Sequence, residues 1–138
     1  MSHLIFFYGT LMAPFNRPGR IRVDSQLMFK GHGSIGAALF DLGLYPAPVP
    51  ADHDTARVRG EVYEMANAAA VLQVLDELEG YRPAEPDESL YSRRLTPVTL
   101  DDGCMVDAWV YFYDARLEHA ERIDSGDYLE YLNGRQRE

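Results

Sequence analysis

The sequence predicts a single α+β domain, and three patterns carry that prediction. An apolar run at residues 3–8 has the composition of a strand buried on both faces. Apolar and polar residues alternate at 57–65 and again at 104–114, the period of two that a strand imposes. Between these strands, residues 67–80 carry an apolar stripe with helical spacing. All 138 residues fit one such domain.

The first part of the chain is predicted to be extended. The initial strand breaks at Gly9 and gives way to a loop at 12–20 that is rich in proline and glycine. A second strand is predicted at 22–31. Residues 40–56 contain three prolines at alternate positions, so this segment is expected to be extended or looped and not helical.

The clearest helix follows the strand at 57–65. Asn67 is placed to cap its N-terminus, and Gly80 is placed to end it. Its last turn reads LDELEGY, which brings Asp76 and Glu79 to a helix end where cations are favoured. A carboxylate on the residue before the glycine is therefore unexpected from helix chemistry alone.

The second half adds two strands and a short helix. The strands are predicted at 90–100 and 104–114, joined by a turn. Arg93 and Arg94 then lie on opposite faces, so at most one of them points into a cavity. A C-terminal helix is predicted to be capped by Ser125 and to stop near residue 134.

Composition and charge exclude several kinds of protein. The formal net charge is −9, and residues 70–138 hold 16 acidic against 7 basic side chains, so nucleic acid is not an expected partner. The single Cys104 excludes an internal disulfide and indicates a reducing compartment. No basic segment followed by an apolar one opens the sequence, and no apolar run approaches about 18 residues. We expect a soluble, cytoplasmic protein with no membrane partner.

Two motifs that invite other functions are weak. GHGSIG at 31–36 matches the glycine fingerprint of dinucleotide-binding folds, but the chain breaks too soon afterwards for the helix that such a site needs. Strand glycines that allow bends or close backbone approach are the expected alternative. The four histidines are scattered without a partner at ligand spacing, so no metal site is expected, and no serine-hydrolase elbow exists.

Four separated pieces together resemble a known family. They are YGTLM at 8–12, GLYPAPV at 43–49 before VRGEVYEM at 58–65, LDELEGY at 75–81 before LYSRR at 90–94, and AWVYFY at 108–113 before RIDSGDY at 122–128. This set resembles the gamma-glutamylcyclotransferase-like superfamily, in the branch that holds gamma-glutamylamine cyclotransferase and the avirulence-induced-gene-like proteins. The resemblance implies a small mixed β-barrel flanked by a few helices, with a cavity at the barrel mouth.

The resemblance also implies chemistry without a cofactor. The α-amine of a small γ-glutamyl substrate attacks its own γ-carbonyl, 5-oxoproline forms, and an amine or peptide leaves. By position, the catalytic glutamate of the family falls on Glu79. The substrate-holding turn falls on Tyr8, Gly9, Thr10 and Leu11, and further substrate contacts fall on Tyr91 and Tyr111. The motifs leave open which amine or peptide is attached.

Acid–base chemistry supports Glu79 independently of the resemblance. An α-amine is mostly protonated at neutral pH, so a base must take its proton and an acid must return one to the leaving nitrogen. One carboxylate can do both if its pKa is raised toward the working pH. The helix C-terminus, the nearby Asp76 and Glu77, and partial burial are each expected to raise the pKa of Glu79.

Other interpretations remain open at this stage. Glu79 could be a solvated residue at a helix end, and Tyr8–Gly9 could be only a turn that closes a strand. Tyr91 and Tyr111 could be core aromatics without ligand contact. The chain as a whole could be a noncatalytic barrel that binds a small molecule or a protein, or a hydrolase that cuts the same bond with water.

Overall fold

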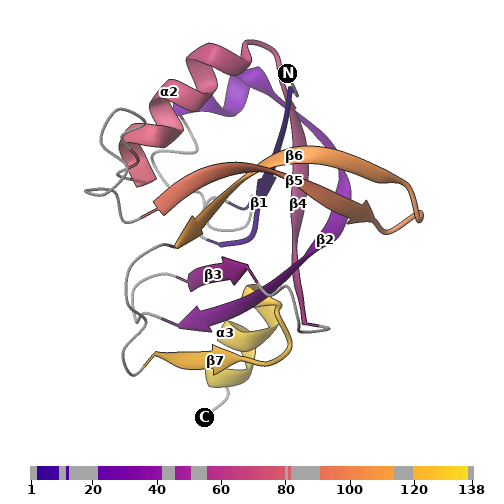
Figure 1. Ribbon diagram of the computed structural model, residues 1–138, viewed down its shortest axis with the longest axis vertical. Coiled ribbons are helices and arrows are strands. Elements are labelled where there is room, and N and C mark those ends of the chain that lie inside the picture. The colour runs from indigo at the N-terminus through magenta and orange to yellow at the C-terminus, as the bar shows by residue number, and fades with distance from the viewer. Residues whose placement is uncertain are drawn as a thin grey trace.

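The computed structural model describes residues 3–9, 12, 22–41, 46–50, 56–79, 81, 91–113 and 120–136. These residues form a closed five-stranded barrel with two further strands and two α-helices, which confirms the predicted α+β barrel (Figure 1). The elements are β1 Leu4–Phe7, a 3-10 turn η2 Asp24–Gln26, β2 Leu27–Asp41, β3 Pro46–Pro50, β4 Arg57–Met65, α2 Ala68–Glu79, β5 Tyr91–Leu100, β6 Met105–Tyr113, β7 Glu121–Ile123 and α3 Tyr128–Gln136.

The barrel follows the strand order β2, β4, β1, β6, β5. It closes where β5 returns to β2, with Gly33 opposite Leu100 and Ser34 opposite Thr99. All barrel pairs are antiparallel except β1 and β6, which run parallel with Ile5 beside Trp109. A closed sheet leaves none of these five strands as a free edge.

Strand β2 is longer than the sequence predicts and serves two sheets. Its first part, residues 27–36, pairs with β4, whereas residues 37–41 pair with β3 and β7 (Figure 1). The predicted strand at 22–31 therefore begins later, after η2, and continues through GHGSIG. No helix follows that motif, so the alternative of strand glycines is confirmed. The three prolines of β3 fit an edge strand, because proline cannot donate to the sheet ladder.

Apolar side chains fill the barrel, and α2 adds to the same core. The fully buried side chains of the five strands include Phe6, Ile35, Val58, Val62, Val98 and Val110. From α2, the predicted apolar stripe supplies Val71 and Leu75, both of which are buried. Helix and barrel are thus one packed unit, and the position of α2 is fixed by the face that it buries.

The ends of α2 are as predicted. The Asn67 side-chain oxygen accepts the Ala70 N–H at 3.2 Å, which confirms the cap. At the other end, the Tyr81 N–H donates to the Asp76 carbonyl at 2.9 Å, the bond that closes a Schellman motif. The last helical residue is therefore Glu79.

The C-terminal helix differs from the prediction at its N-terminal cap and ends at Gln136, near the predicted stop. The cap of α3 is Asp127, whose carboxylate accepts the Glu130 N–H at 3.1 Å. Ser125 lies two residues earlier and instead accepts the Asp127 N–H in the preceding turn. The helix also continues past Gly134, because one glycine costs a helix only about 1 kcal/mol. None of the helices in the described segments has the length and apolar character needed to cross a membrane.

Candidate active site

Glu79 ends α2 and is half-buried. Asp76 precedes it by three residues, a spacing that puts both carboxylates on one face of the helix. This face meets β5 and β6, because the Asp76 side chain contacts Arg93 of β5 and Tyr111 of β6. The C-terminal turn of α2 therefore lies against this part of the barrel.

The Asp76 carboxylate accepts three hydrogen bonds from these two strands. The Arg93 guanidinium donates from Nε at 2.9 Å and from Nη2 at 3.2 Å, one bond to each carboxylate oxygen. The Tyr111 hydroxyl donates to Oδ1 at 2.6 Å. The side chains of Asp76 and Arg93 are only 14% and 17% exposed, so the ion pair is largely screened from water. Bidentate pairs of this kind are the strong and geometrically specific ones.

Aromatic rings hold the Arg93 guanidinium on its other sides. Its central carbon lies 4.7 Å from the ring centre of Trp109 and 5.7 Å from that of Tyr81. Arg94 is exposed and bonds to Ser92 instead. The prediction that the two arginines point to opposite faces is consistent with these contacts.

Tyr111 connects Asp76 to Glu79 electrostatically. Burial raises the pKa of Tyr111 far above its usual range, and the hydrogen bond to Asp76 raises it further. Glu79 also contributes to the raised pKa of Tyr111, so its carboxylate lies within electrostatic reach of the same hydroxyl. Tyr111 therefore stays neutral, and its O–H group donates a hydrogen bond to the Asp76 carboxylate.

The turn after β1 meets the same region. The Tyr8 hydroxyl donates to the Tyr111 carbonyl at 2.8 Å. The Met12 N–H donates to the Gly9 carbonyl at 2.9 Å, the bond that closes a four-residue β-turn. Thr10 and Leu11, the other residues predicted to hold the substrate, lie outside the described residues.

Pro46 of β3 joins this turn to Tyr91. A Cβ atom on Gly9 would lie 2.7 Å from the Pro46 ring, so the glycine is needed for this close approach. The Tyr91 hydroxyl donates to the Pro46 carbonyl at 3.3 Å. These contacts give Gly9 and Tyr91 structural roles, whatever else they do.

The described predicted residues therefore come together through two sets of contacts. Tyr8 and Tyr111 connect to the last turn of α2, and Gly9 connects to Tyr91 through Pro46. Their roles as substrate contacts stay predictions. The cavity expected at the barrel mouth also stays a prediction, because residues 82–90 and most of 10–21 lie outside the described part.

The charge of Asp76 is compensated by Arg93, so the repulsion by which the sequence predicts that Asp76 raises the pKa of Glu79 is weakened. This ion pair joins two residues that are 17 positions apart on different elements. Two features of the sequence could have indicated an ion pair here. Asp76 and Glu79 share one helix face, and the next predicted strand contains Arg93 and Arg94.

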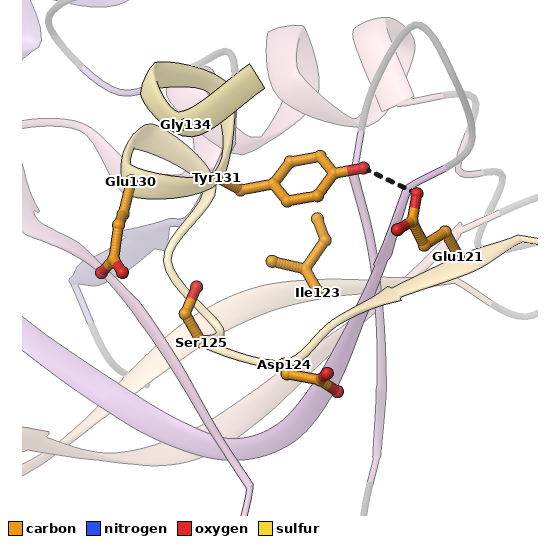
Figure 2. A pocket seen from close by; sticks show the side chains of 7 residues that line it. All are labelled: Glu121, Ile123, Asp124, Ser125, Glu130, Tyr131 and Gly134. Carbon is orange, nitrogen blue, oxygen red and sulfur yellow. Dashed lines mark hydrogen bonds between the residues drawn. The ribbon is translucent and has the colours of Figure 1, made fainter. Parts of the chain in front are cut away.

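A separate hollow of about 480 Å³ lies between β7 and the first turns of α3 (Figure 2). Its lining residues are Glu121, Ile123, Asp124, Ser125, Glu130, Tyr131 and Gly134. The Tyr131 hydroxyl donates to Asp41 at 2.7 Å and lies 3.1 Å from Glu121. Among the described residues of this lining, three are acidic and none is a lysine or arginine, which disfavours an anionic ligand. None of the predicted site residues that the structure describes lines this hollow, so it is a different place from the candidate site.

Comparison with known proteins identifies the family. The model of the family described as gamma-glutamyl cyclotransferase, AIG2-like, matches residues 5–130. The gamma-glutamylcyclotransferase family protein YtfP of Escherichia coli K12 is 31% identical over 127 residues, 91% of this chain and 96% of YtfP. A relative from Methanocaldococcus jannaschii is 30% identical over 92% of this chain and 96% of its own.

Solved structures agree with this assignment. The solution structure of E. coli YtfP has a TM-score of 0.66 at 31% identity and covers 94% of this chain and 98% of its own. The crystal structure of YkqA from Bacillus subtilis has a TM-score of 0.74 at 25% identity, and this chain spans 44% of it. A mouse AIG2-like protein, at 23% identity and a TM-score of 0.64 over 91% of this chain and 88% of its own, shares the fold.

The chain belongs to the AIG2-like gamma-glutamyl cyclotransferase family. Its function is gamma-glutamylcyclotransferase-like at the level of the family, which indicates an enzyme. The names of the relatives give family membership and leave the substrate unassigned.

Proposed function

We propose that this protein releases 5-oxoproline from a γ-glutamyl amine or γ-glutamyl peptide, with Glu79 as general acid and base. The observation that carries the proposal is the place of Glu79. It is a half-buried carboxylate at a helix end, one turn beyond an aspartate that is already paired. A helix C-terminus disfavours a negative charge, so a carboxylate there tends to have a raised pKa. A base of this kind is useful near neutral pH.

The reaction removes two protons from the α-ammonium group. Glu79 takes the first, and the free amine then attacks the γ-carbonyl carbon. A carbon–nitrogen bond forms and closes a five-membered ring, with negative charge on the former carbonyl oxygen and a second proton still to be lost from the ring nitrogen. The carbonyl re-forms and the bond to the leaving nitrogen breaks as Glu79 returns its proton to that nitrogen, and the second proton passes from the ring nitrogen to the departing amine. No water is consumed, and the products are 5-oxoproline and the protonated amine.

Orientation supplies much of the rate in such a ring closure, because both reacting groups belong to one molecule. We propose that the turn of Tyr8, Gly9, Thr10 and Leu11 holds the substrate, since a glycine lets a ligand approach main-chain N–H groups. Tyr91 and Tyr111 are proposed to border the same site from β5 and β6. No cofactor enters these steps.

A noncatalytic binding barrel is the second candidate. It is favoured by the hydroxyl groups of Tyr8, Tyr91 and Tyr111, each of which already donates to the protein itself. Those bonds are what a purely structural role requires. They do not explain an acidic residue at the end of α2, which a binding module has no need to place there.

The test is a product assay on a panel of γ-glutamyl amines, dipeptides and isopeptides. We expect 5-oxoproline from at least one member, and a loss of about 10²–10⁴-fold in Glu79→Gln, the usual worth of proton transfer by a positioned group. Glu77→Gln is the matched control, because Glu77 is an exposed acid two residues away. Free glutamate in place of 5-oxoproline would indicate a hydrolase. An inert wild type would favour the binding barrel.

A further inference from the structure

We infer that Asp76 and Arg93 are positioning residues, which fix the last turn of α2 against β5 and so hold Glu79 in place. This inference rests on the proposed function of Glu79. Asp76 is three residues before Glu79, so a rotation or shift of this turn moves both side chains together. Three hydrogen bonds on the Asp76 carboxylate oppose such a shift.

The positive charge that lies at the C-terminal end of α2 comes from another element of the fold. The last turn of α2 contains no basic residue, although a helix C-terminus favours a cation. Arg93 of β5 brings that cation to Asp76, and the rings of Trp109 and Tyr81 hold it there. The pair therefore compensates the helix end as well as anchoring it.

A second arginine–aspartate pair shows what an ordinary pair looks like in this fold. Arg59 of β4 binds Asp101 of the turn after β5 through two bonds, at 2.9 and 3.0 Å. Like the pair of Arg93 and Asp76 it is bidentate, although Arg59 donates from Nη1 and Nη2 and Arg93 from Nε and Nη2. The side chains of Arg59 and Asp101 are 43% and 54% exposed. Because that pair belongs to the β5–β6 turn and not to the end of α2, it provides a matched control.

The electrostatic surroundings of Glu79 make the inference testable. Tyr111 on β6 interacts electrostatically with Glu79, Asp76 and Glu77 lie in the same helical turn, and Asp76 is paired with Arg93. Asp76 and Arg93 carry opposite charges, so their sum near Glu79 is zero. Removal of either partner leaves a single charge, and its sign depends on which partner was removed.

The experiment compares Asp76→Asn, Arg93→Gln and the double variant, assayed for 5-oxoproline across pH. We expect kcat to fall by about 10–100-fold in each single variant with a much smaller change in KM, as misplacement of a catalytic group predicts. Without Asp76, the unpaired cation favours ionised Glu79, so the acidic limb of the kcat/KM profile moves to lower pH. Without Arg93, the unpaired carboxylate moves that limb to higher pH. In the double variant, the acidic limb of the kcat/KM profile is expected to return to its wild-type pH, whereas kcat is expected to stay low.

Controls separate a positioning role from loss of stability. Arg59→Gln and Asp101→Asn break the control pair and are expected to leave kcat and both limbs unchanged. Arg93→Lys keeps the positive charge but loses the bidentate hydrogen bonding of the guanidinium group. We therefore expect the acidic limb of the kcat/KM profile to stay at its wild-type pH while kcat is reduced. The inference is overturned if the variants at 76 and 93 shift the limb in the same direction, or if their kcat losses only follow the unfolded fraction. If Glu79→Gln is as active as the wild type, the proposed function itself is wrong.

Discussion

Asp76 of α2 and Arg93 of β5 form a bidentate ion pair, with nitrogen–oxygen distances of 2.9 and 3.2 Å. The pair is the point at which the helix end and the barrel wall are joined by charge. It also explains how α2 can end in several acidic residues, since a neighbouring strand provides the cation that the helix lacks. The final carboxylate of the helix is Glu79, the residue that we propose to act as acid and base.

Tyr111 is predicted to make stability fall at alkaline pH. Its pKa is raised in the folded state, whereas an unfolded tyrosine titrates near pH 10. Below about pH 10 the contribution is fully present, and above it the unfolded state binds fewer protons than the folded state, so stability falls by up to about 1.4 kcal/mol per pH unit. The Tyr111→Phe variant is expected to lack the fall in folding stability that Tyr111 causes above about pH 10. Urea unfolding at pH 8 and pH 11 measures it, with the partly exposed Tyr113→Phe of the same strand as control. Equal losses in the wild type and Tyr111→Phe would contradict the prediction.

Asp127, not Ser125, is predicted to be the residue whose removal weakens α3. Asp127→Ala removes the acceptor of the Glu130 N–H and should cost about 1 kcal/mol. Ser125→Ala removes only a bond in an exposed turn and should cost less. Thermal unfolding of both variants provides the comparison, and a larger drop in Tm for Ser125→Ala would show that the cap is assigned to the wrong residue.

The elements with a local cause could be predicted from the sequence. Asn67 caps α2 because a side-chain acceptor three residues from an N–H needs no distant partner, and the strand at Arg57–Met65 shows its period of two within nine residues. The end of β2 had no such cause. Its extension to Asp41 depends on pairing with β3, which follows next in the chain, and with β7, which lies far along the chain.

The residues of the candidate site also differ in whether their cause is local in the sequence or depends on the folded barrel. Glu79 could be found because its charge conflicts with its own helix end, which is a local conflict. The Asp76–Arg93 pair could not, since only the closed barrel brings β5 beside α2. The sequence therefore indicates the residue proposed to react, whereas the residues that hold it in place become visible only in three dimensions.

Gly33 is predicted to be essential for closing the barrel, although GHGSIG suggests a nucleotide. A Cβ atom there would lie 2.8 Å from the Thr99 carbonyl oxygen and 3.0 Å from a Val98 methyl group. Gly33→Ala should therefore cost about 1–3 kcal/mol, the usual cost of overpacking. Gly36→Ala is the control from the same motif, since its nearest new contact is the flexible Arg57 side chain at 3.5 Å. Similar midpoints of urea unfolding for the two variants would contradict this role.

Gly9 is predicted to affect activity more than stability. A Cβ atom at this position would lie 2.7 Å from Cγ and 3.2 Å from Cδ of Pro46, so Gly9→Ala pushes the turn and β3 apart. The Tyr91 hydroxyl bonds to the Pro46 carbonyl, and the displacement therefore reaches β5 as well.

If this turn holds the substrate, a shift of about 1 Å lowers activity by up to about 10²-fold. We expect Gly9→Ala to lose 5-oxoproline formation in that range while Tm falls by only a few degrees, roughly the effect of 1 kcal/mol in a domain of this size. Gly134→Ala is the control. It lies in α3 with open space around it, and alanine there should stabilise the helix by up to about 1 kcal/mol and leave activity unchanged. Full activity in Gly9→Ala, measured on the substrate that the panel identifies, would mean that the turn serves only to close the strand.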